Sequence, residues 1–411
     1  MGAKREHNYK SKETPGYTML NPVFIKILRM LVTVGSFFGF LPFKLDNERG
    51  KLRVDLRSRA KSIHSAMWLV AYSWLVLPTH TYELYRMQNL HKLSYTVVIM
   101  LCATMGIILD GLLTINSEGV CQFLNAFYKL LESFPEKYMP NYDYTREKLR
   151  MKLTEAAFII STALCVWLGF MVAIHSWLEP SAPAYMLFMI PKESLTLPVY
   201  IIASTWFSIY AVNVTVVLAT IPLHGLCYFI YVLPILHTEL RLGLSPSKYK
   251  AIGILREPNQ LVVNYKMLQI FVKMVNNEFG ILFVVLQLLF IQIILFCNVT
   301  LMFQWQDLKI NTKILLTFIA GFATCGWATF LFVAGIQYGY SEAATESWKL
   351  EYWSTRTERL YMERVKWSLR PFSFGDGKRF IIKPVTVLKY IDSVSINTFR
   401  SLITYGNVLG Y

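Results

Sequence analysis

Charged residues are scarce in this sequence. Asp, Glu, Lys and Arg make up only 16% of its 411 residues, whereas a typical soluble domain has about 25%. Hydrophobic residues account for 54% of the chain, and the mean hydropathy is +0.39. This composition excludes a disordered chain, and it leaves too little polar surface to cover a soluble multidomain protein. The sequence therefore predicts a polytopic membrane protein.

Motifs for metal binding and catalysis are also missing. The six cysteines include no CxxC pair, and five of them lie in apolar runs, which is typical of reduced packing residues. The seven histidines include no HxxxH pair that a helix would place on one face. The apolar segments contain neither paired carboxylates nor a Ser/His/Asp set. We therefore expect no enzymatic activity, no metal and no cofactor, and we assign no catalytic residue.

Long apolar segments dominate the chain, and a membrane span needs about 20 apolar residues. Six clear segments are 62–82, 94–113, 155–178, 198–235, 279–303 and 314–336. A seventh segment, 386–408, is weaker because it contains three charged residues. Segment 198–235 exceeds one span, so two short spans broken at Pro222 or Gly225 are the alternative to one long helix that continues past the membrane. The pattern predicts an all-α fold with seven transmembrane helices.

The first apolar run, residues 21–43, differs from the later ones. It carries Lys26 and Arg29 on one face and lacks a small-residue cleavage site. This pattern favours an interfacial or re-entrant helix over a signal peptide or a span. The predicted regions are a cytosolic N-terminal segment (1–61), transmembrane helices 1–6 (62–336), and a cytosolic helix followed by the seventh transmembrane helix (337–411).

Basic residues alternate strongly between the two sides of the predicted membrane. Of the 41 Lys and Arg residues, 34 lie in the segments 1–61, 116–153, 236–277 and 338–385, and 5 lie in the segments 81–93, 179–197 and 304–313. Because cytosolic loops are enriched in Lys and Arg, this distribution predicts a cytosolic N-terminus and an extracellular C-terminus. It also accounts for the net charge of +15 without a nucleic-acid partner.

The predicted topology bears on the class of membrane protein. A G-protein-coupled receptor has its N-terminus outside, and the Asp/Glu-Arg-Tyr motif of that class is absent at the end of the third span. Transporters commonly show buried charges or repeated halves. The acidic residue well inside the first six segments is Asp110, which we interpret as a helix-end residue at the interface. A receptor or a channel remains.

The seventh segment is polar along one side. Asn397, Ser401 and Thr404 follow the i, i+4, i+7 spacing of one helix face, and Val408 continues the stripe. A water-lined pore shared by several subunits would explain this stripe. A cytosolic amphipathic tail or a helix buried against its neighbours is the alternative. The candidate pore residues are Asn397, Ser401, Thr404, Tyr405 and Val408.

The C-terminal sequence resembles the arthropod seven-span chemoreceptors, the gustatory and odorant receptors. A basic segment ends in Trp-Ser-Leu-Arg-Pro at residues 367–371, a short Gly-containing turn follows, and a final helix ends at Thr404-Tyr405. Gustatory receptors end this helix with Thr-Tyr, five hydrophobic residues and Gln-Phe. Here residues 406–410 include two glycines and an asparagine, and Tyr411 stands in place of Gln.

This resemblance implies a ligand-gated, nonselective cation channel in the plasma membrane of sensory neurons. It implies a homo- or heterotetramer of related subunits, each contributing its last helix to a central pore, with spans 4 to 7 forming a cytosolic anchor. The expected partners are membrane lipids and a small organic tastant or odorant, bound among the outer halves of spans 2 to 6. Thr-Tyr favours a gustatory over an odorant receptor. A metabotropic seven-helix receptor without its own pore is the further alternative.

Large aromatic and polar residues in the outer halves of the spans are candidates for the ligand pocket. An apolar, aromatic pocket with a few polar groups suits a small organic ligand. Helix packing and interhelical hydrogen bonds are the alternative explanation. The candidates are Trp167, Met171, His175, Trp206, Tyr210, Asn213, Gln287 and Asn298.

Overall fold

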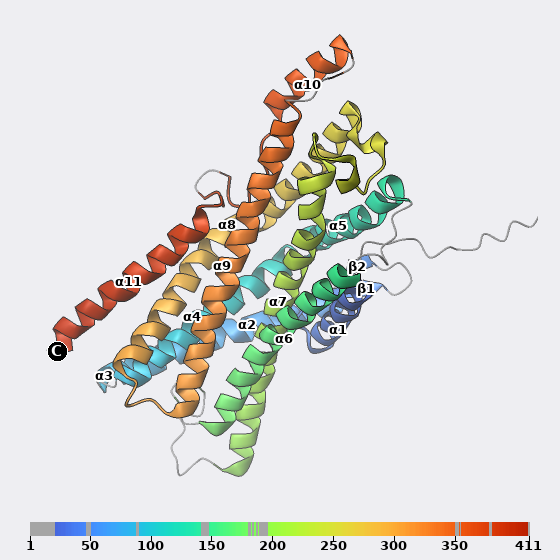
Figure 1. Ribbon diagram of the computed structural model, residues 1–411. Helices are drawn as coiled ribbons and strands as arrows, with labels where there is room; N and C mark the ends of the chain where they lie inside the picture. Colours follow the sequence, from blue (N-terminus) through green and yellow to red (C-terminus); the bar gives the residue numbers. More distant parts are fainter. Residues whose placement is uncertain are drawn as a thin grey trace, which may run out of the picture.

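Helices make up most of the computed structural model (Figure 1). The structure describes residues 21–46, 51–87, 90–140, 148–179, 182, 185, 188, 196–349, 353, 355–377 and 380–409. Its α-helices are α1 (Pro22–Phe38), α2 (Leu56–Ala71), α3 (Leu77–Arg86), α4 (Leu90–Ile115), α5 (Ser117–Tyr138), α6 (Lys148–Leu178), α7 (Leu197–Pro234), α8 (Pro258–Phe303), α9 (Ile310–Ser347), α10 (Arg356–Ser368) and α11 (Thr386–Leu409). Short elements are the π turns η1 (Tyr72–Val76) and η5 (Ile235–Glu239), the 3₁₀ turns η6 (Pro246–Lys248) and η7 (Gly253–Arg256), and the strands β1 (Phe43–Asp46) and β2 (Lys51–Val54), which pair antiparallel.

Five helical segments within the described residues are long and apolar enough to cross a membrane: Lys92–Ile115, Met151–Leu178, Leu197–Glu239, Pro258–Phe303 and Ile310–Ser347. They coincide with the second to sixth predicted spans. The prediction of an all-helical, multi-pass membrane protein is therefore confirmed. The first and seventh predicted spans are helical in the structure, as α2 with α3 and as α11, but they fall outside this set. Both stay predictions.

Helix α7 settles the choice between one long helix and two short ones in its region. It continues unbroken from Leu197 to Pro234 with Pro222 in its interior, and the π turn η5 extends it to Glu239. The structure therefore has one long helix here rather than two short ones, and the side of the basic segment that follows stays a prediction. Figure 1 shows the ends of α7, α8 and α9 continuing into a region that also holds α5 and α10.

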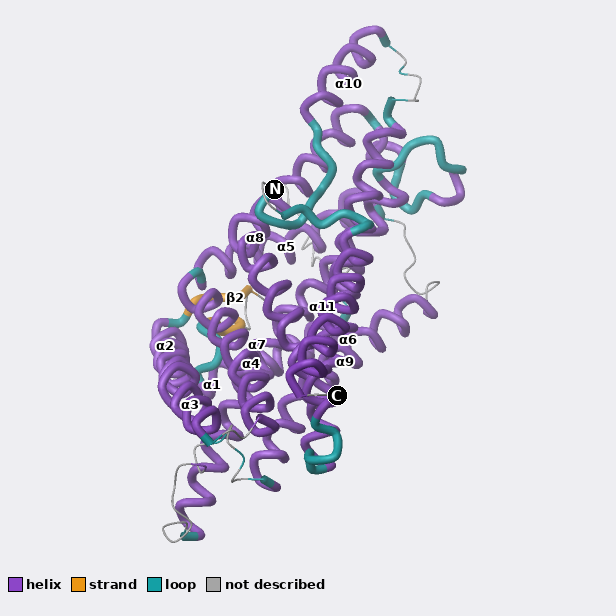
Figure 2. The backbone as a smooth tube through the Cα atoms, turned by 90° about the vertical axis from the view of Figure 1, so that its left-hand side faces the viewer, coloured by secondary structure: helices purple, strands orange, loops and turns teal. Residues whose placement is uncertain are grey.

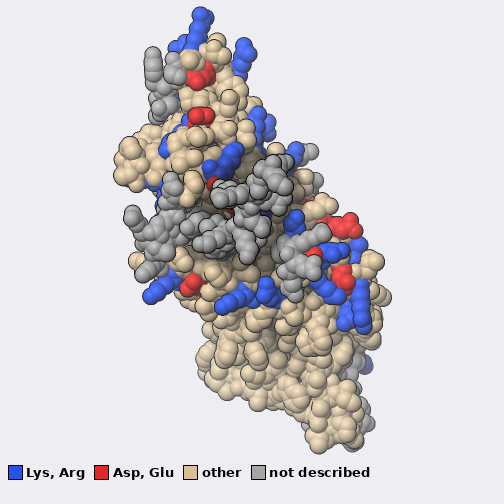
Figure 3. All heavy atoms as spheres, turned by 90° about the vertical axis from the view of Figure 1, so that its right-hand side faces the viewer, with Lys and Arg blue, Asp and Glu red and all other residues tan. Residues whose placement is uncertain are grey.

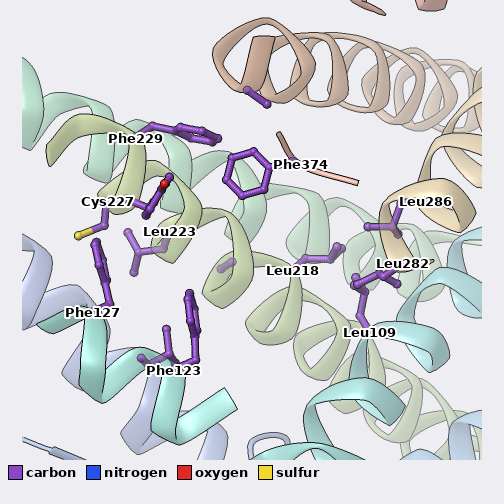
Figure 4. Close-up of a cluster of buried hydrophobic side chains, with 14 of the residues drawn as sticks. Leu109, Phe123, Phe127, Leu218, Leu223, Cys227, Phe229, Leu282, Leu286 and Phe374 are labelled. Atoms are coloured by element: carbon purple, nitrogen blue, oxygen red, sulfur yellow. The ribbon is translucent and has the colours of Figure 1, made fainter. Parts of the chain in front are cut away.

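A continuous hydrophobic core joins the region that holds α5 and α10 to the rest of the helix bundle. Figure 4 shows Phe127 of α5, Phe229 of α7 and Phe374 of the segment before α11 around one cluster, which continues through Leu282 toward Leu109 of α4. The rings of Phe229 and Phe374 lie 5.7 Å apart and meet edge to face. The segment that leads to α11 is thereby fixed to α7 and α8.

Two glycines allow the segment before α11 to cross closely over α8 and α9. A Cβ at Gly280 would lie 2.8 Å from the carbonyl oxygen of Gly375, and one at Gly335 would lie 2.9 Å from Cα of Pro384. Because these neighbours are backbone atoms, they cannot rotate away as a side chain would. The position at which α11 begins is therefore set by backbone contact with two long helices.

The N-terminal helix is shorter than predicted. Helix α1 ends at Phe38, and Gly39 follows with a φ of +81°. The prediction of a helix over 21–43 is wrong for its last residues, which lead into strand β1 instead. Lys26 and Arg29 are exposed as expected, while Phe24 and other apolar side chains pack inward.

The entry to α2 is fixed by an aspartate outside the predicted span. The Asp55 carboxylate accepts hydrogen bonds from the Ser58 N–H at 2.9 Å and the Ser58 hydroxyl at 2.8 Å. It also pairs with the Lys44 ammonium at 2.9 Å. The bond from Lys44 and then those from Ser58 lower the pKa of Asp55 to about 2. The cap therefore stays ionised at neutral pH.

Charged side chains gather on one part of the surface. In the face drawn in Figure 3, Lys and Arg lie over the upper and middle parts, whereas the lower part is almost wholly uncharged. A lower part that is apolar to this extent fits a lipid environment. The charged part is the one that carries α10, in agreement with the predicted cytosolic side.

Candidate ligand cavity and last helix

A cavity of about 100 Å³ lies inside the apolar half of the bundle. Helices α4, α6, α7, α8 and α9 line it, and Leu69 and Tyr72 close it from the first predicted span. Its lining is almost wholly apolar, because Tyr72, Cys102, Tyr210 and Thr215 are the lining residues with polar side-chain atoms. The position, between helices in the membrane-embedded part, is one where proteins commonly bind small molecules.

Small residues open the space, and close helix contacts keep it in place. Ala103, Ala211 and Ala323 line the cavity from three different helices. Gly169, also a lining residue, allows α6 to approach α7, since a Cβ there would lie 1.8 Å from Oγ1 of Thr215. Because these alanines and this glycine have no larger side chains, they leave the space that forms the cavity.

Aromatic rings form one wall. The rings of Trp206 and Tyr210 lie 4.2 Å apart, and the Tyr72 ring contacts Trp206 at 6.2 Å and Phe207 at 5.9 Å. Tyr72 begins the π turn η1, in which the N–H of Leu77 bonds to the Tyr72 carbonyl. Such turns often occur at functional sites, where they redirect a side chain. Here the turn lies directly beside the cavity.

A buried polar cluster lies beside the cavity. The His175 ring lies 2.5 Å from the Tyr185 hydroxyl through Nδ1 and 3.1 Å from the Thr312 hydroxyl through Nε2. The Tyr95 hydroxyl joins the cluster, 3.0 Å from that of Tyr185. The Tyr185 ring also packs on Phe207, a lining residue, at 4.7 Å. Tyr185, from the loop between α6 and α7, thus connects the polar cluster to a residue that lines the cavity.

The predicted ligand residues are distributed around this cavity rather than within it. Tyr210 lines it, and Trp206 lies behind Tyr210 in the aromatic wall. His175 belongs to the buried polar cluster. Asn213 is buried and donates to the Ser65 hydroxyl at 2.6 Å. Trp167 is 53% exposed on the surface of α6.

The other predicted ligand residues lie on α6 and α8. Met171 packs partly buried against the core without lining the cavity. The Gln287 side-chain oxygen is buried and has no hydrogen-bond partner among the described residues. Asn298 donates to the Thr398 hydroxyl of α11 at 3.3 Å. Ligand contact by these residues stays a prediction. The candidates chosen from the sequence did not include the small and aliphatic residues that line the cavity, because only large aromatic or polar side chains were considered.

Helix α11 lies at the edge of the bundle. It packs against α8 and α9; Figure 1 shows it at the left edge of the bundle, and Figure 2, seen from that side, shows it in front of other helices. Tyr390 and Thr398 are buried on the side toward the bundle, whereas Phe399 and Ile403 are about two-thirds exposed on the other side, at 66% and 65%. This apolar free side is available to lipid or to a neighbouring subunit.

The predicted pore residues lie near the end of α11. Asn397 and Ser401 are half-buried at the margin between the packed and free sides. Thr404 is exposed, and its hydroxyl donates to the Arg400 carbonyl at 2.9 Å. The side chains of Tyr405 and Val408 lie outside the described residues. A role of the stripe in a pore stays a prediction, since it depends on neighbouring chains.

The same fold occurs in solved structures of an insect receptor. The olfactory receptor OR5 from Machilis hrabei superposes with a TM-score of 0.60 at 11% identity, covering 94% of this chain and 98% of that chain. The structure of that receptor in complex with eugenol gives a TM-score of 0.61 at 10% identity, covering 93% and 98%. No protein-family model and no curated protein sequence matches the chain. For the fold, the resemblance to insect-type chemoreceptors is therefore confirmed: this chain has the fold of an insect olfactory receptor over nearly its whole length.

Proposed function

We propose that this chain is a chemosensory receptor that forms a ligand-gated, nonselective cation channel with other subunits of its kind. The cavity carries this proposal. It is apolar and lined by helices, in a fold shared with a receptor that has been solved in complex with eugenol, a small aromatic molecule. A catalytic role receives no comparable support from the described residues. The proposed activity is therefore the detection of a small molecule rather than catalysis.

The lining indicates the chemistry of the ligand. Aromatic and aliphatic side chains surround the space, and the Thr215 hydroxyl donates its hydrogen bond to the Ala211 carbonyl at 2.6 Å. Tyr210 thus offers a hydroxyl close to the cavity for orienting a polar group. A small, largely apolar molecule with one polar group fits this lining best.

Helix α8 connects the cavity to the last helix. Phe290 and Ile293 of α8 line the cavity, and Asn298 lies less than two turns further along the same helix. The bond from Asn298 to Thr398 joins α8 to α11. A ligand that favours one position of α8 would therefore also favour one position of α11, which is the differential binding that gating needs.

The proposed assembly is a tetramer of identical or related subunits in the plasma membrane of sensory neurons, with α11 of each subunit around a shared pore. The exposed apolar side of α11 supports contact with neighbours. The Thr404-Tyr405 pair supports a gustatory receptor, with an odorant receptor as the second candidate.

Excised membrane patches test whether the chain conducts by itself. In cells that express this chain alone, an active ligand should evoke cation current in a patch without added nucleotide, because opening depends on ligand binding only. Eugenol, sugars, bitter compounds and other small volatiles are the first panel. A response that disappears on excision and returns with GTP would instead establish a metabotropic receptor.

Epitope tags test the proposed topology. A tag at the N-terminus should be reached by antibody only after permeabilisation, and a tag after Tyr411 should be labelled on intact cells, because 34 of the 41 Lys and Arg residues lie on one side. If the C-terminal tag were labelled only after permeabilisation, α11 would not cross the membrane. If the N-terminal tag were labelled on intact cells, the chemoreceptor topology would be contradicted.

A further inference from the structure

A carboxylate is buried among hydroxyl groups between α2 and α4. Asp110 is only 1% exposed. Its Oδ1 accepts a bond from the Ser62 hydroxyl at 3.4 Å, and Ser62 lies 2.6 Å from the Thr114 hydroxyl. Asp110 does lie near the end of α4, as interpreted, but its side chain is buried inside the bundle, which the interpretation did not predict.

Hydroxyl groups contact this carboxylate, but no positively charged group among the described residues pairs with it. The second carboxylate oxygen of Asp110, Oδ2, is buried without a hydrogen-bond partner, and none of the ion pairs among the described residues involves Asp110. Burying an unpaired charge in a membrane protein is strongly unfavourable. The carboxylate therefore needs a positively charged or proton partner that the described residues do not supply.

A second unpaired oxygen lies one helical turn further out. Ser65 follows Ser62 by three residues, which places both on the same side of α2. The Ser65 hydroxyl accepts the bond from the Asn213 amide, and Asn213 Oδ1 is buried without a partner. Asn213 in turn follows Tyr210, the lining residue, by three residues on α7. The two hydrogen-bonded groups, one at Ser62 and one at Ser65, therefore lie one turn apart on the same side of α2.

We propose that this cluster, made of Ser62, Ser65, Asp110, Thr114 and Asn213, binds one monovalent cation. Its donors are all oxygen atoms, which hard cations prefer. A single carboxylate matches a single positive charge, whereas calcium sites generally gather several carboxylates and carbonyls. The cation would neutralise Asp110 and tie α2 to α4 and α7.

Salt substitution on the purified protein tests the site without ligand or current. The thermal unfolding midpoint, measured in lipid nanodiscs at equal ionic strength, should be higher in sodium or potassium chloride than in choline chloride, whose cation is too large to enter. Asp110→Asn should abolish this difference, because it keeps the shape of the side chain but removes the charge. Asp307→Asn, at an exposed position between α8 and α9, is the matched control and should keep the difference.

Direct binding supplies the second readout. Radioactive sodium should bind the wild-type protein at one ion per chain, bind Ser62→Ala more weakly, and fail to bind Asp110→Asn. Equal unfolding midpoints of the wild-type protein in all three salts would overturn the proposal and leave a proton as the partner of Asp110. Unchanged sodium binding by Asp110→Asn would overturn it as well. Neither result depends on whether the chain is a channel.

Discussion

Thr404→Lys is expected to suppress ligand-evoked cation current almost completely while the protein still reaches the cell surface. Thr404 is exposed on the last helix, so the longer side chain has room in the single chain. In a tetramer with α11 around the pore, the substitution would place a ring of four ammonium groups in the path of the cations, and such a ring repels them. Thr404→Asp should have the opposite effect and favour divalent cations. Whole-cell current and reversal potentials, together with surface biotinylation, measure both outcomes.

Cysteine substitution provides the control for this prediction. Cysteines at Asn397, Ser401 and Thr404 should react with small aqueous thiol reagents in the presence of ligand. Cysteines at Phe399 and Ile403 should react little, since these side chains point to the free apolar side that lipid or a neighbouring subunit covers. If Thr404→Lys and Thr404→Asp both kept wild-type permeability, or if only Phe399 and Ile403 were accessible, the polar stripe would not line the pore.

Ala323→Leu is expected to raise the ligand concentration for half-maximal response by well over tenfold, or to remove the response. Ala323 lines the cavity and is 3% exposed, so the larger side chain can extend only into the space that the ligand needs. A single methylene changes binding in an apolar pocket by roughly 10- to 200-fold, and this substitution adds three carbon atoms. Concentration–response curves with any active ligand measure the shift.

Ala328→Leu is the matched control for the cavity. It makes the same substitution on the same helix, α9, at a half-buried position that does not line the cavity. Its response should stay within about threefold of the wild type, because it leaves the ligand contacts intact. The thermal unfolding midpoint of both variants separates lost binding from lost folding. An unchanged response in a well-folded Ala323→Leu protein would show that ligands bind elsewhere.

Both predictions depend on the connection between the cavity and the last helix. Filling the cavity should act on ligand sensitivity, whereas a charge at Thr404 should act on conduction at every ligand concentration. Asn298 and Thr398 lie between these two sites and touch each other. Asn298, chosen from the sequence as a ligand residue, does not line the cavity, and we propose that it couples the two helices instead.

The sequence by itself determined which helices are long and apolar enough to cross a membrane. Lipid requires long apolar helices, and therefore composition alone located the second to sixth spans. Lys and Arg counts indicated which loops share a side. The continuity of α7 through Pro222 followed from the same counts, since two spans would have inverted every later loop. These features depend on local composition, which a sequence states directly.

Tertiary structure alone decided where the cavity lies and what surrounds Asp110. The cavity exists because Ala103, Ala211 and Ala323 from three helices face one point, and an alanine in a membrane helix is otherwise indistinguishable from a packing residue. Asp110 stood out in the sequence as an acidic residue within an apolar segment. Its burial against Ser62 of another helix could not be predicted from the sequence. The physical reason is common to both: a cavity and a buried charge are properties of faces that meet across helices, and helical periodicity specifies each face without specifying its partner.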